Sequence, residues 1–276
     1  MGRIGSACLL LLALLLPLVA SIGPLPKALL ACMGLLLSVK ILQLDGAAAG
    51  SVIRRHPLWH ALAPFDIESA RAVRPGADRI ALLEMFAYGV LASIAWLGLS
   101  RPWPMTQGLP LVPLFLGMGL VYCGMETLTV GLRFAHRLAG VEVSAMQRAP
   151  ILARSIGEFW SERWNRPVST WLNRYVFRPV TRRHGRVLAM LSTFAISAAL
   201  HAWLFFVAVG WRAAAMAGSF FLLHGVLVLL EHGLRIQAWP SVARRAWTVG
   251  LLLVSSPLFV LPVLQALRID AIGLAR

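Results

Sequence analysis

The 276-residue sequence has few charged residues, and very few of them are acidic. Only 13% of its residues are charged, with 11 Asp and Glu against 26 Lys and Arg, whereas 59% are apolar. A soluble globular domain has about a quarter charged residues and under half apolar residues. The composition therefore excludes a water-soluble globule and a disordered chain, and it predicts a protein that is surrounded by lipid.

The sequence also lacks the signatures of several enzyme and binding classes. Its three cysteines, Cys8, Cys32 and Cys123, lie singly within apolar runs, so neither a disulfide framework nor a metal site is expected. It contains no glycine-rich nucleotide-binding motif and no GxSxG hydrolase motif. The formal net charge of +15 is explained by basic loops between membrane spans rather than by nucleic-acid binding. We therefore expect no metal, no resident cofactor and no nucleic-acid partner.

Seven apolar stretches are long enough to cross a bilayer as helices. A helix that rises about 1.5 Å per residue needs about 20 residues to cross about 30 Å of hydrocarbon. The first stretch also has the features of a signal peptide, but a second follows almost at once, which favours a retained helix. The sequence thus predicts an all-α polytopic membrane protein with one integral membrane domain over residues 1–276. The stretches are Ser6–Ile22, Ala28–Leu44, Ile80–Leu99, Leu109–Leu132, Val187–Val209, Ala213–Leu234 and Ala246–Leu267.

The basic residues predict how these spans are oriented. Twenty of them lie on the side that holds the N-terminus and the long segment 134–186, against five on the other side. Basic loops remain in the cytoplasm, so we expect a cytoplasmic N-terminus and an external C-terminus. Arg outnumbers Lys by 24 to 2, which is typical of GC-rich bacterial genomes and favours a bacterial inner membrane.

The segment 134–186 is too apolar for a soluble domain. Aromatic residues such as Trp171 and Tyr175 share one helical face, while Arg174 and Arg178 share another. This pattern is typical of helices that lie at the membrane interface. We expect interfacial or re-entrant helices on the cytoplasmic side.

Several ionisable residues lie inside the predicted spans, where a charge is costly and usually marks a functional site. His201 and His224 lie at similar expected depths on consecutive spans, so both are candidates to face one cavity; a core histidine bonded to a carbonyl is the alternative. Glu126 either pairs with an arginine or lines a cavity. Glu231 and His232, close to a span end, are interpreted as interfacial.

Residues 154–205 carry four motifs in a fixed order. They are F-W-x-x-R-W-N at Phe159–Asn165, V-x-x-W-L at Val168–Leu172, Y-V-x-R-P at Tyr175–Pro179, and a helix of small residues that ends in a histidine, Ser197–His201. This set resembles the wax synthase-type branch of the membrane-bound O-acyltransferase family, in which His201 corresponds to the family histidine.

The resemblance implies transfer of a fatty acyl group from an acyl thioester, acyl-CoA above all, to a hydroxyl acceptor. A neutral imidazole, with an ordinary pKa of about 6.5, suits removal of the acceptor proton. His201 is the predicted general base, and Asn165 is the predicted polar partner that binds the oxyanion or the donor. The predicted substrate-binding residues are Phe159, Trp160 and Trp164 at the donor entrance, Arg163 at the phosphates of CoA, and His224.

Two features of the sequence depart from the family pattern. Many members carry Glu directly after the histidine, whereas this chain has Ala202, so that Glu126 or Glu231 would have to replace it. The chain is also short for the family. The alternative hypothesis is a catalytically weak or inactive acyltransferase-fold protein that binds or transports lipid. The acceptor stays open among a fatty alcohol, diacylglycerol, a sterol-like alcohol and a polyketide or glycan hydroxyl.

Overall fold

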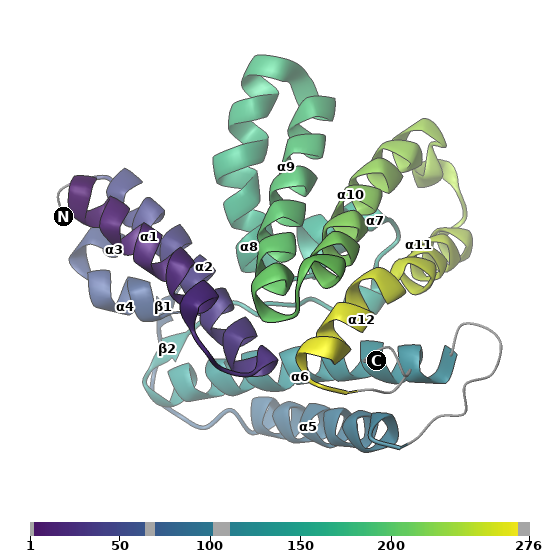
Figure 1. Cartoon of the computed structure of the whole chain (residues 1–276), viewed down its shortest axis with the longest axis horizontal. Helices are drawn as coiled ribbons and strands as arrows, with labels where there is room; N and C mark the ends of the chain where they lie inside the picture. Colours follow the sequence, from purple (N-terminus) through teal and green to yellow (C-terminus); the bar gives the residue numbers. More distant parts are fainter. Residues whose placement is uncertain (1–2, 64–69, 102–110, 270–276) are drawn as a thin grey trace.

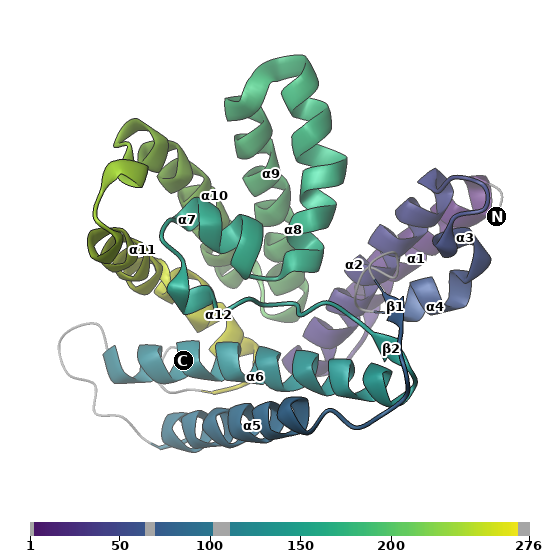
Figure 2. The same ribbon diagram turned by 180° about the vertical axis from the view of Figure 1, so that it is seen from behind.

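The computed structural model describes residues 3–63, 70–101 and 111–269, and nearly all regular structure in these ranges is helical (Figures 1 and 2). This confirms the predicted all-α class. The N-terminal half contains α1 (Arg3–Val19), α2 (Pro24–Gly46), α3 (Val52–Arg55), α4 (Pro57–Leu62), α5 (Arg79–Leu99) and α6 (Leu111–Leu138). Two-residue strands, β1 (Arg71–Ala72) and β2 (Val141–Glu142), pair antiparallel with Arg71 opposite Glu142.

The C-terminal half contains both long helices and short irregular turns. The 3₁₀ turns are η2 (Pro150–Leu152) and η5 (Ile236–Ala238), and the π-helical turns are η3 (Phe159–Arg163) and η4 (Asn173–Phe177). The α-helices are α7 (Ile156–Glu158), α8 (Arg166–Leu172), α9 (Arg178–Ala208), α10 (Trp211–Gly233), α11 (Ser241–Ser255) and α12 (Pro257–Ala266).

The described helices make the chain an integral, multi-pass membrane protein. Five of them are long and apolar enough to cross a bilayer, or six if α11 and α12, which meet at 46°, form one broken span. Each predicted apolar stretch coincides with one of these helices or with α1, which contains the shorter apolar helix Leu9–Val19. The expected number of seven spans therefore stays a prediction. Many large apolar side chains point outwards, with Val254 81% exposed, as is required of a surface that contacts lipid.

The segment predicted as interfacial or re-entrant is helical, but it folds differently from a set of surface helices. The helix formed by α8, η4 and the first residues of α9 runs up to Gly185, where the chain turns back and continues to Ala208 (Figure 1). Gly185 adopts φ 83° and ψ 170°, a conformation that only glycine reaches without strain. The motif segment therefore lies beside the span that carries His201.

Three pairs of neighbouring helices, α1 with α2, α5 with α6 and α9 with α10, make the most extensive contacts with each other. Helix α12 joins two of these pairs. Its Val260 and Leu264 are buried against Leu99 of α5 and Leu114 of α6, and its Ala266 is buried in a cluster with residues of α9 and α10. Helix α9 approaches α10 closely at Gly225, where an added Cβ would lie 2.9 Å from the Cβ of Phe194. This close contact places His201 and His224 on adjoining helices.

Candidate active site

His201 lies on the second part of α9 with one ring nitrogen engaged. Its Nδ1 is 2.8 Å from the carbonyl oxygen of Ser197. Because a carbonyl only accepts hydrogen bonds, Nδ1 must carry the proton, and in the neutral ring Nε2 is then unprotonated. No described side chain or backbone group hydrogen-bonds this Nε2. The geometry leaves a basic nitrogen available to a substrate.

The ring of His201 is held by aromatic side chains. It stacks on Phe221 of α10, with ring centroids 4.0 Å apart and planes 27° apart, and its edge meets Phe259 of α12 at 5.8 Å. These two phenylalanines fix the orientation of the imidazole. They also surround it with apolar surface, which disfavours water at the ring.

His224 has the opposite arrangement. The indole Nε1–H of Trp160 donates to its Nδ1 at 2.9 Å, so the ring proton must be on Nε2, which donates to Ser255 Oγ at 2.8 Å. The Ser255 hydroxyl in turn donates to the carbonyl of Leu251 at 2.7 Å. His224 is fully buried, and both of its nitrogens are occupied. The structure therefore makes it a positioning residue for Trp160, and its contact with substrate stays a prediction.

The three aromatic residues of the motif form a continuous path to His201. Trp164 stacks on Phe159, with centroids 5.7 Å and planes 13° apart, and Phe159 meets Trp160 edge-on at 5.0 Å. Trp160 then packs at 5.3 Å against Phe221, the ring on which His201 stacks. The structure thus brings the motif and the family histidine together, although they lie about 40 residues apart in the chain.

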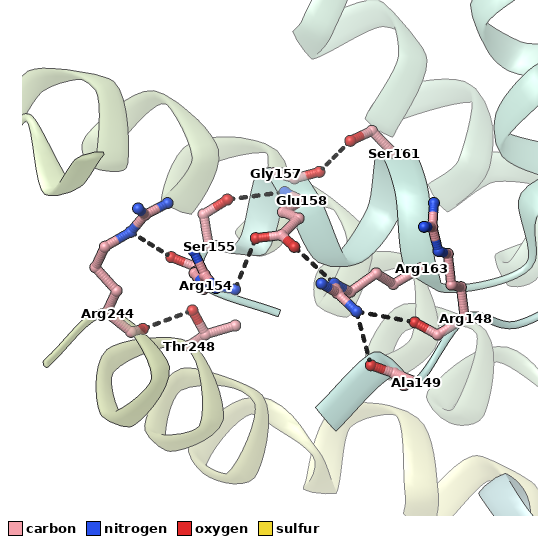
Figure 3. A network of polar contacts seen from close by, with 10 residues as sticks. All are labelled: Arg148, Ala149, Arg154, Ser155, Gly157, Glu158, Ser161, Arg163, Arg244 and Thr248. Atoms are coloured by element: carbon pink, nitrogen blue, oxygen red, sulfur yellow. Dashed lines mark hydrogen bonds and ion pairs between the residues drawn. The ribbon is translucent and has the colours of Figure 1, made fainter. Parts of the chain in front are cut away.

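A polar network fixes the backbone that carries these aromatics (Figure 3). Ser155 caps α7, because its hydroxyl accepts the backbone N–H of Glu158 at 2.8 Å. The Glu158 carboxylate accepts the backbone N–H of Arg154 at 2.9 Å and pairs with Arg163 Nε at 2.6 Å. This is close to the reciprocal arrangement of a capping box. The π-helical turn η3 follows directly, and such turns are frequent at functional sites.

Arg163 is committed to contacts within the protein. Besides its ion pair with Glu158, its Nη1 donates to the carbonyls of Arg148 and Ala149 at 3.0 and 3.2 Å (Figure 3). Ala149 adopts a left-handed conformation with φ 44°, which is strained for a residue with a side chain. Arg163 thus holds a strained loop against the motif, and its predicted contact with the phosphates of CoA stays a prediction.

Asn165 ends the motif in a left-handed conformation, with φ 41° and ψ 57°. Asparagine tolerates this region better than most residues. Its side-chain Oδ1 is buried without a hydrogen-bond partner among the described residues. Since a buried acceptor without a partner is costly, Oδ1 is available for a ligand.

Glu231 has a structural role that the sequence interpretation did not predict. It was expected at the interface, but it is only 1% exposed. Its carboxylate accepts the backbone N–H groups of Ile156 at 2.7 Å and Gly157 at 3.2 Å, and the indole N–H of Trp247 at 3.2 Å. Glu231 therefore fixes the start of the motif segment to α10. The signal that could have revealed it was a carboxylate inside an apolar helix.

No carboxylate of the described residues hydrogen-bonds His201. Glu126 is buried on α6 and contacts Thr129 at 3.5 Å, and Glu231 is engaged as above. The backbone carbonyl of Ser197 instead orients the imidazole. Ala202 lies against Gly218 of α10, where an added Cβ would be 3.5 Å from the Ala202 Cβ. The ranges that the structure covers contain no group of three or more His, Cys, Asp or Glu residues that could hold a metal.

The Glu158–Arg163 pair predicts an acid-dependent loss of stability. Burial raises the pKa of Glu158, but the hydrogen bond from Arg154 and the guanidinium of Arg163 outweigh burial and hold this pKa below its ordinary value. The contribution of the pair is therefore complete above the unfolded-state pKa of about 4.3 and is lost as pH falls through the folded-state pKa. We expect the melting temperature of the wild type to fall more steeply below pH 4.3 than that of Glu158→Gln. Parallel curves for the two proteins in detergent would contradict this.

Comparison with known proteins places these residues in a family context. The model of the membrane-bound O-acyltransferase family matches residues 100–227, which include the motif, His201 and His224. Probable long-chain-alcohol O-fatty-acyltransferase 2 of Arabidopsis thaliana is 35% identical over 117 residues, covering 40% of this chain and 34% of the relative. Long-chain-alcohol O-fatty-acyltransferase of Simmondsia chinensis is 31% identical over 163 residues, covering 54% and 46%.

A third relative belongs to a different substrate class. Acyl-CoA–sterol O-acyltransferase 1 of Arabidopsis thaliana is 27% identical over 119 residues, covering 40% of this chain and 34% of the relative. The chain spans less than half the length of each of these three relatives. The family match over residues 100–227 and the wax synthase-type relatives confirm the predicted resemblance to the membrane-bound O-acyltransferase family.

Proposed function

We propose that this protein is an O-acyltransferase that moves a fatty acyl group from an acyl thioester to the hydroxyl group of a lipophilic alcohol. One observation carries the proposal. His201, at the family position, has its Nδ1 proton held by the Ser197 carbonyl and its Nε2 unoccupied, within an aromatic cluster continuous with the motif. The names of the relatives support the same reaction class.

The reaction follows from these atoms. Nε2 of His201 takes the hydroxyl proton of the acceptor while the acceptor oxygen attacks the thioester carbonyl carbon. The tetrahedral adduct collapses as the carbon–sulfur bond breaks and the electron pair leaves on sulfur. The imidazolium returns the proton to that thiolate, giving an ester and a free thiol. The Ser197 carbonyl accepts Nδ1–H throughout and stabilises the protonated ring.

The remaining residues of the site position the reactants. Asn165 offers a buried amide whose N–H groups can donate to the developing oxyanion and whose Oδ1 lacks a partner. The aromatic rings of Phe159, Trp160 and Trp164 exclude water, which would otherwise hydrolyse the thioester. We assign acyl-CoA as the donor and co-substrate, with no resident cofactor.

The acceptor is proposed as a long-chain alcohol. Of the three relatives described above, the two with the higher identity are named for that substrate. The test is incubation of the purified protein with radiolabelled acyl-CoA and hexadecanol, followed by separation of ester, fatty acid and thiol. The proposal predicts one ester for each CoA released. Fatty acid without ester would indicate a hydrolase, and neither product would favour the alternative of an inactive lipid-binding or transport protein.

The orientation in the membrane is a further proposal. The excess of basic residues on one side supports a cytoplasmic N-terminus in a bacterial inner membrane, with acyl-CoA arriving from the cytoplasm. We expect reporter fusions at Pro75 and Pro240 to be cytoplasmic, and fusions at Gln107 and Arg276, which lie outside the described residues, to be external. An external signal at Pro75 would contradict this orientation.

A further inference from the structure

Gln147 lies in a loop that is bound along its length to the end of the motif. The backbone N–H of Arg148 donates to the carbonyl of Arg163 at 2.8 Å, and the backbone N–H of Arg166 donates to the carbonyl of Met146 at 2.9 Å. These two bonds flank Gln147 on one segment and Trp164 and Asn165 on the other. Gln147 therefore lies opposite the family asparagine.

Side chains reinforce this pairing. Nη1 of Arg163 donates to the carbonyls of Arg148 and Ala149, and Nη1 of Arg166 donates to the carbonyl of Ala145 at 3.2 Å. The loop is thus fixed on both sides of Gln147, so that the backbone of Gln147 is held against the motif.

The amide of Gln147 is buried and has no partner. The residue is only 5% exposed, and neither its Nε2 nor its Oε1 makes a hydrogen bond to any described group. A buried polar group without a partner costs about 1–3 kcal/mol, and native proteins contain few of them. Asn165 Oδ1, on the opposite segment, is buried without a partner as well. Each of the two facing segments therefore carries a buried side-chain amide with at least one atom that makes no hydrogen bond.

A ligand that satisfies these groups must offer both donors and acceptors. A trans secondary amide carries its N–H donor and its C=O acceptor on opposite edges, so the Gln147 amide can donate to the carbonyl while Asn165 Oδ1 accepts the N–H. The acyl chain and the long-chain alcohol have no amide, whereas the pantetheine arm of CoA has two secondary amides set back from the sulfur. The donor arm is therefore the part of the substrates that fits.

We propose that Gln147, together with Asn165, binds an amide of the pantetheine arm of the acyl thioester and so positions the donor for attack. This rests on the proposed function only in taking acyl-CoA as the donor. Gln147 is thus a donor-binding residue contributed by the loop that precedes the family motif.

The test uses Gln147→Leu, which keeps the approximate volume and removes the amide. Binding of an S-alkyl thioether of CoA, which cannot transfer its chain, is measured by titration calorimetry on purified wild type, Gln147→Leu and His201→Ala. We expect Gln147→Leu to weaken binding at least tenfold, which corresponds to about 1.4 kcal/mol. His201→Ala should bind as the wild type does. The melting temperature of Gln147→Leu should be unchanged or higher, because an unpaired polar group has been removed from the interior.

The outcomes separate this proposal from the proposed function. Equal affinity of Gln147→Leu and wild type, or no binding by either, overturns the role of Gln147. If Gln147→Leu binds the thioether more weakly than the wild type, but the wild type produces no ester, the donor site is supported and acyl transfer is contradicted. In active protein, Gln147→Leu should raise the KM for acyl-CoA and leave the KM for the alcohol unchanged; equal changes in both would overturn the assignment.

Discussion

Replacement of His201 by alanine is expected to lower kcat for ester formation by about 10²–10⁴-fold, the usual loss when a general base is removed. His201→Gln should be similarly inactive, because an amide occupies the same space but has no basic nitrogen. Both proteins should insert into the membrane and elute as monodisperse species in detergent.

His232→Ala is the matched control. His232 also lies on a membrane helix and also directs Nδ1 to the carbonyl four residues earlier, Val228, at 2.8 Å, but its side chain is exposed. Its removal should leave kcat unchanged. Turnover of His201→Gln at the wild-type rate would exclude general-base catalysis by this ring, and unfolding of both His201 variants would assign His201 a structural role.

Replacement of Glu231 is expected to produce the largest loss of stability. Glu231→Ala leaves three donors without their acceptor, the N–H groups of Ile156 and Gly157 and the indole of Trp247. At about 1–3 kcal/mol for each buried donor, the free energy of unfolding should fall by at least about 3 kcal/mol. That corresponds to a decrease in melting temperature of roughly 10 °C for a protein of this size.

Ester formation should fall with it, because Glu231 holds the start of the segment that carries the aromatic motif. Glu231→Gln, which keeps one acceptor oxygen, should lose less stability than Glu231→Ala. Glu84, exposed on α5, provides the control, and Glu84→Ala should melt within about 1 °C of the wild type. If Glu231→Ala melted like Glu84→Ala, the proposed attachment of the motif to α10 would be wrong.

The sequence predicted the helical class, the positions of the apolar helices and the region of the site. Those features depend on local hydropathy and on the motif around Phe159–Asn165, and both can be recognised directly in the sequence. The fold back at Gly185 was not predicted, because one glycine in a basic helical segment does not reveal whether its φ angle is positive. That turn places the helix formed by α8, η4 and the first residues of α9 beside the second part of α9.

The roles of the two intramembrane histidines also required the structure. Both are expected at similar depths in apolar helices, and nothing in their immediate sequence separates them. Their difference depends on groups distant in the chain, since Trp160 and Ser255 engage both nitrogens of His224 while His201 bonds only its local carbonyl. The same holds for Glu231, whose backbone partners lie about 75 residues earlier.

The hydrogen bonds leave His201 with an unprotonated, available Nε2, whereas they place the ring proton of His224 on Nε2. Solid-state ¹⁵N NMR of histidine-labelled protein in lipid bilayers at neutral pH measures this directly, with His201→Gln and His224→Gln used to assign the two rings. We expect a protonated Nδ1 and an unprotonated Nε2 at His201, and the reverse at His224. A protonated Nε2 at His201 in the resting protein would contradict general-base catalysis by His201, because that nitrogen could not then take the proton of the alcohol.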